Sequence, residues 1–468
     1  MKKYPLYIFI LSLSYLLYEN PNSKYIIAGI GIFVIGMRFM EDGFKLFTGG
    51  VLEKLISKTT DTTFKSISLG VVSTALLQSS SLVSIIIISF LSAKIISLAG
   101  ALGVVFGSAV GTTTTTWLVA TLGVKIDISA FALPMIIFGV IFKFDKSNNI
   151  QGIGNILLGL GFVFLGISYM KSGFEELKQG IDLAKFSLDG YEGIFLYGFI
   201  GFLATIIIQS SSATMALTVT ALVTGQIVYI NAMAIALGAH VGTATTAAMG
   251  AIVSNANSKR MAVGLFIYKG ITAILTIAFL YYIVDFVDYL SAILGISSDD
   301  WAMKLAVFHT LFNLTGLIVF SFFIPQLVIF LKKLFVEDAS IYIQKPKYLD
   351  VEIVAVPLVA LKATRKETIH LYDNATEVLS HAIMLHRHRY LDKSNIDLVV
   401  KESTDLIELD IDEFYKTRIK SLYGDIINYS TYFINDLNDA ERNYLYSLRM
   451  ACRDIAEAVK NTKELQQN

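Results

Sequence analysis

Two short polar blocks of the same composition interrupt long apolar stretches of this sequence. The first reads Gln-Ser-Ser-Ser at residues 78–81, and the second repeats it at residues 209–212, 131 positions later. Serine hydroxyls and glutamine amides donate and accept hydrogen bonds, so they are able to satisfy backbone groups freed by a turn and still face a ligand. Their oxygens suit a hard cation such as sodium, and their donors, with helix N-termini, suit an oxyanion. One cluster of this kind can hold both, and it needs no fixed lysine or arginine.

A structural interpretation of these polar residues has to be weighed against the chemical one. Serine, threonine and glycine are favoured where membrane helices pack closely and hydrogen-bond to one another. A scattered serine fits that interpretation, whereas a block that recurs at matching places favours a binding site. The threonine run at residues 112–116 stays open between the two, although Thr112 is favoured as a site residue because Thr243 matches it.

The composition places the elements that carry these blocks in a membrane. Of 468 residues, 54% are hydrophobic and 16% are charged, whereas about 25% of the residues of a soluble domain are charged. The net charge is zero, which gives no argument for a nucleic-acid partner. The single cysteine, Cys452, excludes an intramolecular disulfide. The N-terminal stretch lacks a signal-peptide cleavage site, so we expect it to be an uncleaved first span.

Long apolar runs alternate with short loops up to about Phe335. A helix needs about 20 apolar residues to cross a bilayer. Candidate spans lie near residues 5–18, 25–40, 66–93, 95–122, 129–143, 150–170, 193–225, 227–252, 261–284 and 303–331, and several are too long or too broken to be single straight helices.

The composition reverses near residue 345. From Lys362 onward about a third of the residues are charged, and apolar residues recur at helical spacing, as in a soluble amphipathic helical domain. We therefore predict a transmembrane domain at residues 1–340, a linker at 341–361 and a soluble helical domain at 362–468.

An internal repeat organises the membrane domain. The stretch at residues 29–44 aligns with residues 159–174, and "GSAVGTTTT" at 107–115 aligns with "GAHVGTATT" at 238–246. The two repeats occupy about residues 25–145 and 155–285. Repeated halves with broken polar segments at matching positions are typical of secondary transporters, whose sites lie near the midplane of the bilayer.

His240 lies inside the second Gly/Thr-rich stretch. An ionisable residue within a membrane span is a functional candidate, and histidine titrates near physiological pH. A hydrogen-bonded packing role for His240 stays open. For His309 we expect a packing role. No Gly-Lys-Ser/Thr follows either glycine-rich stretch, which excludes a nucleotide-binding P-loop.

At these residues the chain resembles the bacterial form of the type II sodium–phosphate cotransporters. "QSSSAT" at 209–214 matches the family pattern, "AVFHTLFN" at 306–313 resembles a later helix, and residues 347–367 resemble the link into a PhoU-like domain. The resemblance implies an all-α fold of two inverted repeats, each with a re-entrant hairpin, plus a soluble PhoU-like helical bundle. It implies sodium-coupled symport of inorganic phosphate, with these two ions as substrates and neither a cofactor nor a resident metal. The implied site consists of Gln78, Ser79, Ser80, Ser81, Gln209, Ser210, Ser211 and Ser212, with Thr112, Thr113, Thr243 and His240 beside them.

The sequence also departs from the family pattern. The first block continues as "QSSSLV", and the family's asparagine is replaced by Ala109 in one repeat and by His240 in the other. The same fold moving another oxyanion, or coupled to protons, therefore remains an alternative. A membrane phosphate sensor acting through the PhoU-like domain is an alternative of another class. We expect no enzyme, because the membrane half has no carboxylate pair, metal-ligand cluster or nucleophile–base arrangement.

Charge sets the expected orientation. Lys259 and Arg260 are separated from Lys332 and Lys333 by two candidate spans, so both pairs lie on one side of the membrane. The positive-inside rule makes that side cytoplasmic. We expect a multi-pass protein of the inner (plasma) membrane whose C-terminal domain is cytoplasmic and is a candidate surface for a homo-oligomer or a regulatory partner.

Overall fold

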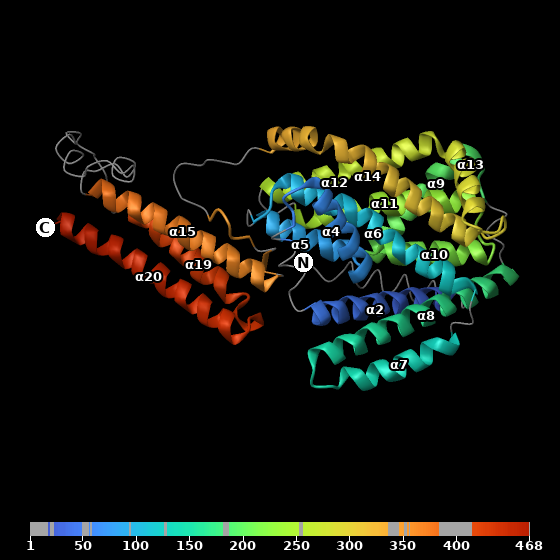
Figure 1. Cartoon of the computed structure of the whole chain (residues 1–468), viewed down its shortest axis with the longest axis horizontal. Helices are drawn as coiled ribbons and strands as arrows, with labels where there is room; N and C mark the ends of the chain where they lie inside the picture. The colour runs from blue at the N-terminus through green and yellow to red at the C-terminus, as the bar shows by residue number, and fades with distance from the viewer. Residues whose placement is uncertain are drawn as a thin grey trace. The chain divides into compact units, whose positions relative to one another are not determined.

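The computed structural model describes residues 17–18, 23–48, 56, 59–92, 95–125, 129–180, 187–251, 256–335, 346–350, 353–354, 356–382 and 414–467. All regular structure in these ranges is helical (Figure 1), so the predicted all-α class is confirmed. The predicted span at 5–18 lies almost wholly outside the described residues. The helices are α2 (Ser23–Thr48), α4 (Thr63–Leu77), α5 (Ser80–Ser92), α6 (Leu98–Lys125), α7 (Ser129–Lys143), α8 (Asn148–Gly180), α9 (Gly190–Ile208), α10 (Ser211–Val223), α11 (Tyr229–Ala251), α12 (Ala256–Ala278), α13 (Leu280–Ile293), α14 (Trp301–Leu334), α15 (Pro357–Ala382), the π-helix η3 (Tyr415–Lys420), α19 (Ser421–Thr431), the short 3-10 helix η4 (Ile434–Asp436) and α20 (Asp439–Gln467).

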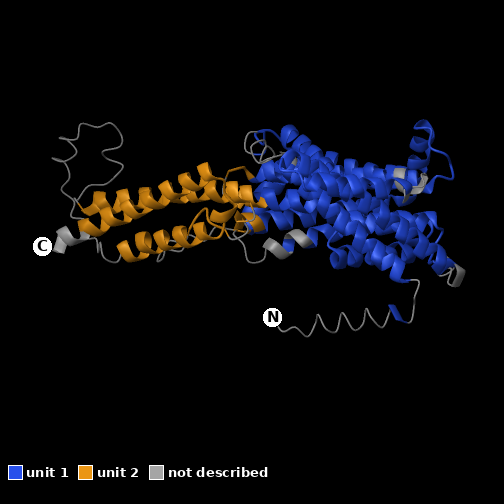
Figure 2. Ribbon diagram, turned by 90° about the horizontal axis from the view of Figure 1, so that it is seen from below, with its two compact units in different colours: residues 1–87, 98–252, 259–334 blue, residues 88–97, 253–258, 335–468 orange. Residues whose placement is uncertain are grey.

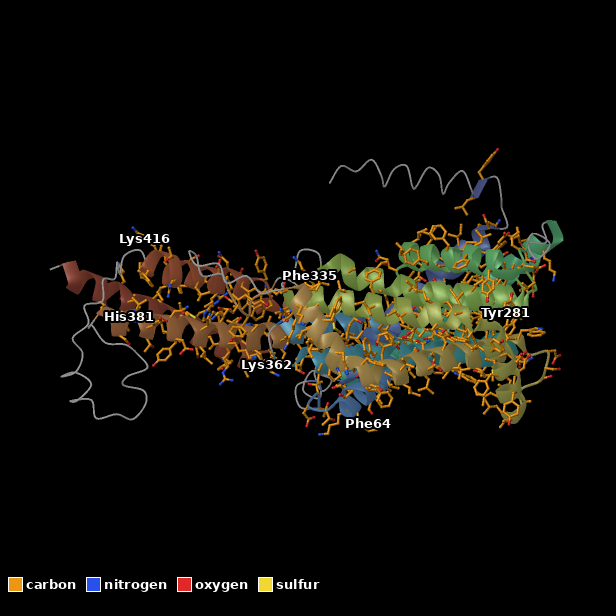
Figure 3. All side chains as sticks on the ribbon, turned by 90° about the horizontal axis from the view of Figure 1, so that it is seen from above. Phe64, Tyr281, Phe335, Lys362, His381 and Lys416 are labelled. Atoms are coloured by element: carbon orange, nitrogen blue, oxygen red, sulfur yellow. The ribbon has the colours of Figure 1, made fainter. Side chains whose placement is uncertain are left out.

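Several of these helices have membrane dimensions. Six of them are long and apolar enough to cross a bilayer, and they are α2, α6, α8, α9, α12 and α14. Large apolar side chains such as Phe64 and Tyr281 are exposed on the outside of these and the shorter apolar helices (Figure 3). Many exposed large apolar side chains on helices of this length suit lipid rather than water. The chain is a membrane protein.

The two Gln-Ser-Ser-Ser blocks each interrupt a helix in the same way. Gln78 ends α4 and Gln209 ends α9, and these are the two non-glycine residues with positive φ in the described chain, at 53° and 57°. The following serine caps the next helix: Ser79 Oγ accepts from the backbone N–H of Leu82, and Ser210 Oγ from that of Ala213, both at 3.2 Å. The block is thus a left-handed helix end followed at once by an N-cap, which is why the candidate spans 66–93 and 193–225 are each two helices.

Glycines hold the broken helices against the long helices that follow them. A Cβ at Gly107 of α6 would lie 2.2 Å from the carbonyl oxygen of Ile67 in α4. A Cβ at Gly238 of α11 would lie 1.8 Å from the carbonyl oxygen of Gly198 in α9. Neither position has room for a side chain, so α4–α6 and α9–α11 pack backbone to backbone at equivalent positions of the two repeats.

Helices α2 and α8 also pack through glycines. A Cβ at Gly29 would lie 2.7 Å from the carbonyl oxygen of Gly166, and a Cβ at Gly36 would lie 2.7 Å from that of Gly159. The residue number falls along α8 as it rises along α2, so the two helices run antiparallel where they meet.

The chain divides into two compact units (Figure 2). Unit 1 contains residues 1–87, 98–252 and 259–334, and unit 2 contains residues 88–97, 253–258 and 335–468. The segments 88–97 and 253–258 therefore group with the C-terminal part of the chain rather than with the predicted transmembrane domain.

A helical bundle makes up most of unit 2. Its core is formed by apolar side chains of α15, η3, α19 and α20, including Leu371, Leu422 and the buried Cys452. Helix α15 begins at Pro357, five residues before the predicted domain start at Lys362, because proline is well suited to the first position of a helix.

Candidate functional site

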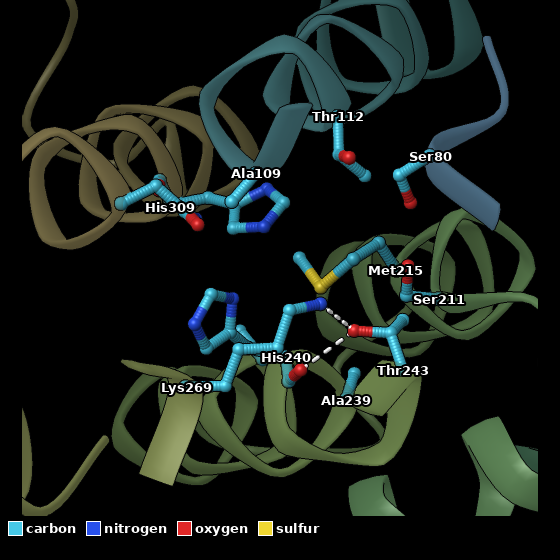
Figure 4. Close-up of a pocket in the computed structure, with 12 residues that line it drawn as sticks. Ser80, Ala109, Thr112, Ser211, Met215, Ala239, His240, Thr243, Lys269 and His309 are labelled. Atoms are coloured by element: carbon cyan, nitrogen blue, oxygen red, sulfur yellow. Dashed lines mark hydrogen bonds between the residues drawn. The ribbon is translucent and has the colours of Figure 1, made fainter. Parts of the chain in front are cut away.

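A small pocket in unit 1 is lined by side chains from both copies of the repeat (Figure 4). Three pairs of lining residues are equivalent in the two repeats, because the members of each pair stand 131 positions apart. The pairs are Ser80 and Ser211, Ala109 and His240, and Thr112 and Thr243; Met215, Ala236, Ala239, Lys269, His309 and Asn313 complete the lining. The fold therefore brings equivalent positions of the two halves to one place.

The two lining serines begin helices. Ser80 is the first residue of α5 and Ser211 is the first residue of α10. Figure 4 shows their hydroxyl groups pointing toward one another. The first N–H groups of a helix have no partner within it and carry a partial positive charge, which favours an anion. Two helix N-termini and two hydroxyls thus meet at this end of the pocket.

The other residues of the predicted blocks do not line the pocket. Gln78 and Ser79 form the first turn, and Ser210 forms the second one, as described above. Gln78 Nε2 also donates to the hydroxyl of Thr114 at 2.9 Å, whereas Gln209 is exposed. Ser81, which is half-buried, is one residue beyond the lining.

Ser212 connects the two repeats. Its hydroxyl lies 3.3 Å from the hydroxyl of Thr115, which donates to Gln78 Oε1 at 2.8 Å. Ser212 and Thr115 are both buried. These contacts hold the second block against α6 and against the first block, beside the pocket rather than in its wall.

The predicted threonines separate into two groups. Thr112 and Thr243 line the pocket, and the hydroxyl of each donates to a carbonyl of its own helix, that of Ser108 at 2.9 Å and that of His240 at 2.7 Å. Thr113 is buried away from the pocket and donates to the carbonyl of Val110 at 2.8 Å. A hydroxyl that donates to its own helix keeps its oxygen lone pairs available to a cation or to another donor.

His240 lies in the pocket wall and is 6% exposed. Its ring meets the rings of Tyr268 and Phe312 edge to face, at centroid distances of 5.9 and 5.2 Å. Its Nε2 atom is buried and has no hydrogen-bond partner among the described residues. An unpaired buried polar atom is costly, so this nitrogen is available to a ligand or a water molecule.

Helix α14 contributes two residues that the sequence interpretation did not place in the site. His309 lines the pocket, and its Nδ1 lies 2.7 Å from the hydroxyl of Thr116 in α6. Asn313 is fully buried and donates through Nδ2 to the carbonyl of His309 at 2.8 Å. Its Oδ1 atom has no partner in the described part of the chain. The motif at 306–313 was the available signal, since it contains both residues.

Lys269 of α12 also lines the pocket, and the sequence interpretation did not include this residue in the site. The side chain is 7% exposed, and its ammonium group donates to the hydroxyl of Thr243 (Figure 4). None of the twelve lining residues carries a carboxylate. A charged residue within the apolar stretch 261–284 was the signal that could have identified it.

The pocket is narrow in this structure. The space open to the centre of a water molecule is about 10 Å³, which is room for about one water. An ion larger than about one water molecule would need a wider pocket than this one.

The donor set of the pocket suits ions rather than bond-making chemistry. Hydroxyls, a histidine ring, an amide oxygen and an ammonium group surround it. Among the described residues there is no group of three or more His, Cys, Asp or Glu side chains able to hold a metal ion. Neutral oxygens would coordinate a hard cation, while the helix N-termini and the ammonium group would bind an anion.

These features define the class: an all-helical, polytopic membrane protein with a polar pocket between two broken helices. The chain belongs to the Na+/Pi-cotransporter family, whose model matches residues 32–172 and 190–323. The resemblance noted in the sequence is thereby confirmed. The family is a transporter family.

Relatives of this chain are found in several bacteria. It is 27% identical over 357 residues to YjbB of Escherichia coli (strain K12), provisionally named an inorganic phosphate export protein, a match that covers 76% of this chain and 64% of that protein. It is 30% identical over 288 residues to the uncharacterized protein YqeW of Bacillus subtilis (strain 168), covering 62% of this chain and 90% of that protein. The chain spans 64% of the length of the first curated relatives that it matches. No solved structure matches it.

Proposed function

We propose that this chain is a secondary transporter that moves inorganic phosphate across the plasma membrane, coupled to sodium. The observation that carries the proposal is the pocket to which both repeats contribute equivalent residues, Ser80 and Ser211 among them. Membership of the Na+/Pi-cotransporter family supports phosphate and sodium as the substrates.

Phosphate binds, in this proposal, between the N-termini of α5 and α10. The backbone N–H groups and hydroxyls there donate to its oxygens, and the Lys269 ammonium balances part of its charge. Several moderate donors and one ammonium group suit an anion that must bind and also be released.

Sodium binds, in this proposal, to neutral oxygen atoms in the wall of the same pocket. The oxygen atoms able to coordinate it are the hydroxyls of Thr112 and Ser80 and the Oδ1 atom of Asn313. Because phosphate and sodium attract one another, each ion raises the affinity for the other by the same factor, which couples their movement.

The repeats are proposed to be inverted. Gly29 contacts Gly166 and Gly36 contacts Gly159, whereas the sequence repeat aligns Gly29 with Gly159 and Gly36 with Gly166. Contacts that are exchanged in this way are expected for two elements related by a two-fold axis. Antiparallel, equivalent helices α2 and α8 support an axis in the membrane plane, as in transporters that alternate between two openings.

The side of the membrane and the direction of transport are also part of the proposal. Lys259, Arg260, Lys332 and Lys333 make the side of the C-terminal bundle cytoplasmic by the positive-inside rule. YjbB is named for export. Symport with sodium moves phosphate inward under an inward sodium gradient. Export by this chain would require an outward sodium gradient or an outward phosphate concentration gradient large enough to drive it.

Uptake into proteoliposomes tests the function. Purified protein is reconstituted, and radiolabelled phosphate is followed with an inward sodium gradient, with an outward one and with choline in place of sodium. We expect uptake that is fastest with the inward sodium gradient and is reduced by an excess of unlabelled phosphate. Uptake that responds to a proton gradient and ignores sodium, or that sulfate suppresses more strongly than phosphate, would support the alternatives of proton coupling or another oxyanion.

A phosphate sensor is the candidate of another class. It would bind phosphate without moving it, so labelled phosphate would bind to the protein but would not accumulate inside the vesicles under any gradient. The duplicated broken helices around one pocket support transport instead, because a sensor needs no second copy.

A further inference from the structure

We propose that Lys269 is a built-in cation that takes the place of one coupling sodium ion, so that phosphate binds to this pocket in a sodium-free medium. The proposal rests on the proposed function, and it concerns how the charge of the anion is balanced. It assigns a specificity role to a residue of α12 that lies outside both Gln-Ser-Ser-Ser blocks.

The Lys269 ammonium group has no counter-charge beside it in the described part of the chain. The side chain is 7% exposed and belongs to the candidate span Ala256–Ala278, and the described residues contain no ion-pair partner for it. Its donation to Thr243 is to a neutral hydroxyl. A buried charge without a counter-charge is strongly unfavourable, so an anion bound in the pocket would stabilise the charged form of Lys269.

A second buried lysine shows the alternative arrangement. Lys304 in α14 is 5% exposed, but its ammonium lies 2.8 Å from the carboxylate of Asp288 and 4.6 Å from the centre of the Trp301 ring. The same chain therefore balances one buried lysine with a carboxylate and leaves the other facing a pocket. This contrast indicates that the counter-charge of Lys269 comes from the ligand.

The position of the ammonium group is asymmetric between the repeats. It binds the hydroxyl of Thr243, while Thr112, the equivalent residue, donates to the carbonyl of Ser108 and receives no ammonium group in the described structure. One half of the pocket is thus supplied with a fixed positive charge. The other half keeps hydroxyl oxygens for a mobile cation.

Charge balance then gives the functional consequence. A monovalent phosphate is neutralised by Lys269 alone, and a divalent phosphate needs one further cation. A pocket without the lysine would need one more mobile cation in each case. The fixed ammonium therefore lowers the sodium requirement for binding by one ion, because like charges in so small a space exclude one another.

Equilibrium binding of radiolabelled inorganic phosphate to the purified full-length protein tests this inference. The wild type, Lys269→Met and Lys269→Arg are compared in choline and in sodium buffers, with Lys304→Met as a matched control for loss of a buried lysine. We expect the wild type, Lys269→Arg and Lys304→Met to bind phosphate in choline. Lys269→Met should bind at least about tenfold more weakly in choline and recover part of that loss in sodium, since one charge-assisted contact is worth roughly a factor of ten.

Thermal unfolding without phosphate separates this role from a structural one. Without phosphate, Lys269→Met should be at least as stable as the wild type, because the substitution removes an uncompensated buried charge. In choline buffer, phosphate should raise the unfolding temperature of the wild type but not that of Lys269→Met. A Lys269→Met protein that is less stable without phosphate, or that binds phosphate in choline as the wild type does, would overturn the inference. Wild-type binding that requires sodium would overturn it while the proposed function stands, and no phosphate binding in either buffer would overturn both.

Discussion

The hydroxyl of Ser212 donates to the hydroxyl of Thr115 across 3.3 Å, and this contact joins the two repeats. The direction follows from the neighbouring bond: Thr115 gives its one proton to Gln78 Oε1 at 2.8 Å, so the proton between the two hydroxyls belongs to Ser212. Residues of both Gln-Ser-Ser-Ser blocks are thus linked through one threonine. A shift at one helix break would therefore be transmitted to the other through these hydrogen bonds.

Thr115→Val tests this link. The substitution keeps the shape of the side chain but leaves Gln78 Oε1 and the Ser212 hydroxyl without this partner, which should cost about 1–3 kcal/mol in stability. The rate of phosphate uptake should fall as well, because the two helix breaks are no longer linked. Thr121→Val on the same helix is the control, because the Thr121 hydroxyl donates to carbonyls of α6 itself, that of Trp117 at 2.6 Å among them. Equal unfolding temperatures and uptake rates for the two variants would show that the link carries no coupling.

His240→Asn should change the pH dependence of sodium-driven uptake. Protonation of His240 would add a second positive charge to a pocket that already contains Lys269 and is also faced by His309. We therefore expect wild-type uptake to fall as the medium is acidified far enough to protonate this buried ring, because the added positive charge repels sodium. In His240→Asn that step should be absent. Superimposable curves would mean that His240 only packs and that the remaining pH response belongs to phosphate or to the other two groups.

Truncation after Tyr348 should leave the phosphate site intact. All twelve lining residues belong to unit 1, whereas the truncation removes most of unit 2. The dissociation constant for phosphate should stay within about a factor of two, since distant sites contribute independently to within about 0.3–0.5 kcal/mol. The transport rate is free to change if the bundle is regulatory. A truncated protein that is monodisperse but binds no phosphate would contradict this division of roles.

Cys452 should report the opening of the C-terminal bundle. The thiol is fully buried and lies 3.3 Å from the hydroxyl of Thr368, and burial raises its pKa above the ordinary value of 9.0. Because the thiolate is the reactive form, a maleimide should label it slowly in the native protein and rapidly in denaturant. A raised pKa in the folded state also means that bundle stability is lost as the pH rises above about 9. Labelling should therefore accelerate there by more than free-thiol ionisation explains. Fast labelling at neutral pH would contradict the packing described for this core.

The breaks in the helices could be predicted from the sequence because the signal is local. A glutamine that accepts a left-handed conformation and a serine that caps the next helix are read directly from "QS" at 78–79 and 209–210. The repeat adds the expectation that the two breaks act together. Within each block, however, the sequence treats four residues alike, whereas the structure places Ser80 and Ser211 in the pocket wall and the glutamines in the turns.

The rest of the pocket depends on which helices pack together, which no local pattern states. Lys269 is the one charged residue in the apolar part of α12, and His309 is part of the long helix α14, so each residue signals a functional position without stating that the two share a pocket. The different surroundings of Gln78 and Gln209 have the same origin. Gln78 finds Thr114 and Thr115 of α6 within reach, whereas Gln209 is exposed although its sequence context is nearly identical.

The central claim is that Ser80 and Ser211, from two different repeats, bind one phosphate ion. The direct measurement is equilibrium binding of radiolabelled phosphate to the wild type, Ser80→Ala, Ser211→Ala and the double variant, with Ser81→Ala as the control from the neighbouring position outside the lining. Each single substitution should weaken binding about tenfold and keep a stoichiometry of one, and the double variant should show a non-additive loss because both hydroxyls contact the same ion. Ser81→Ala should bind as the wild type does. Strictly additive effects with two phosphate ions bound per chain, or wild-type affinity in both single variants, would contradict a shared site.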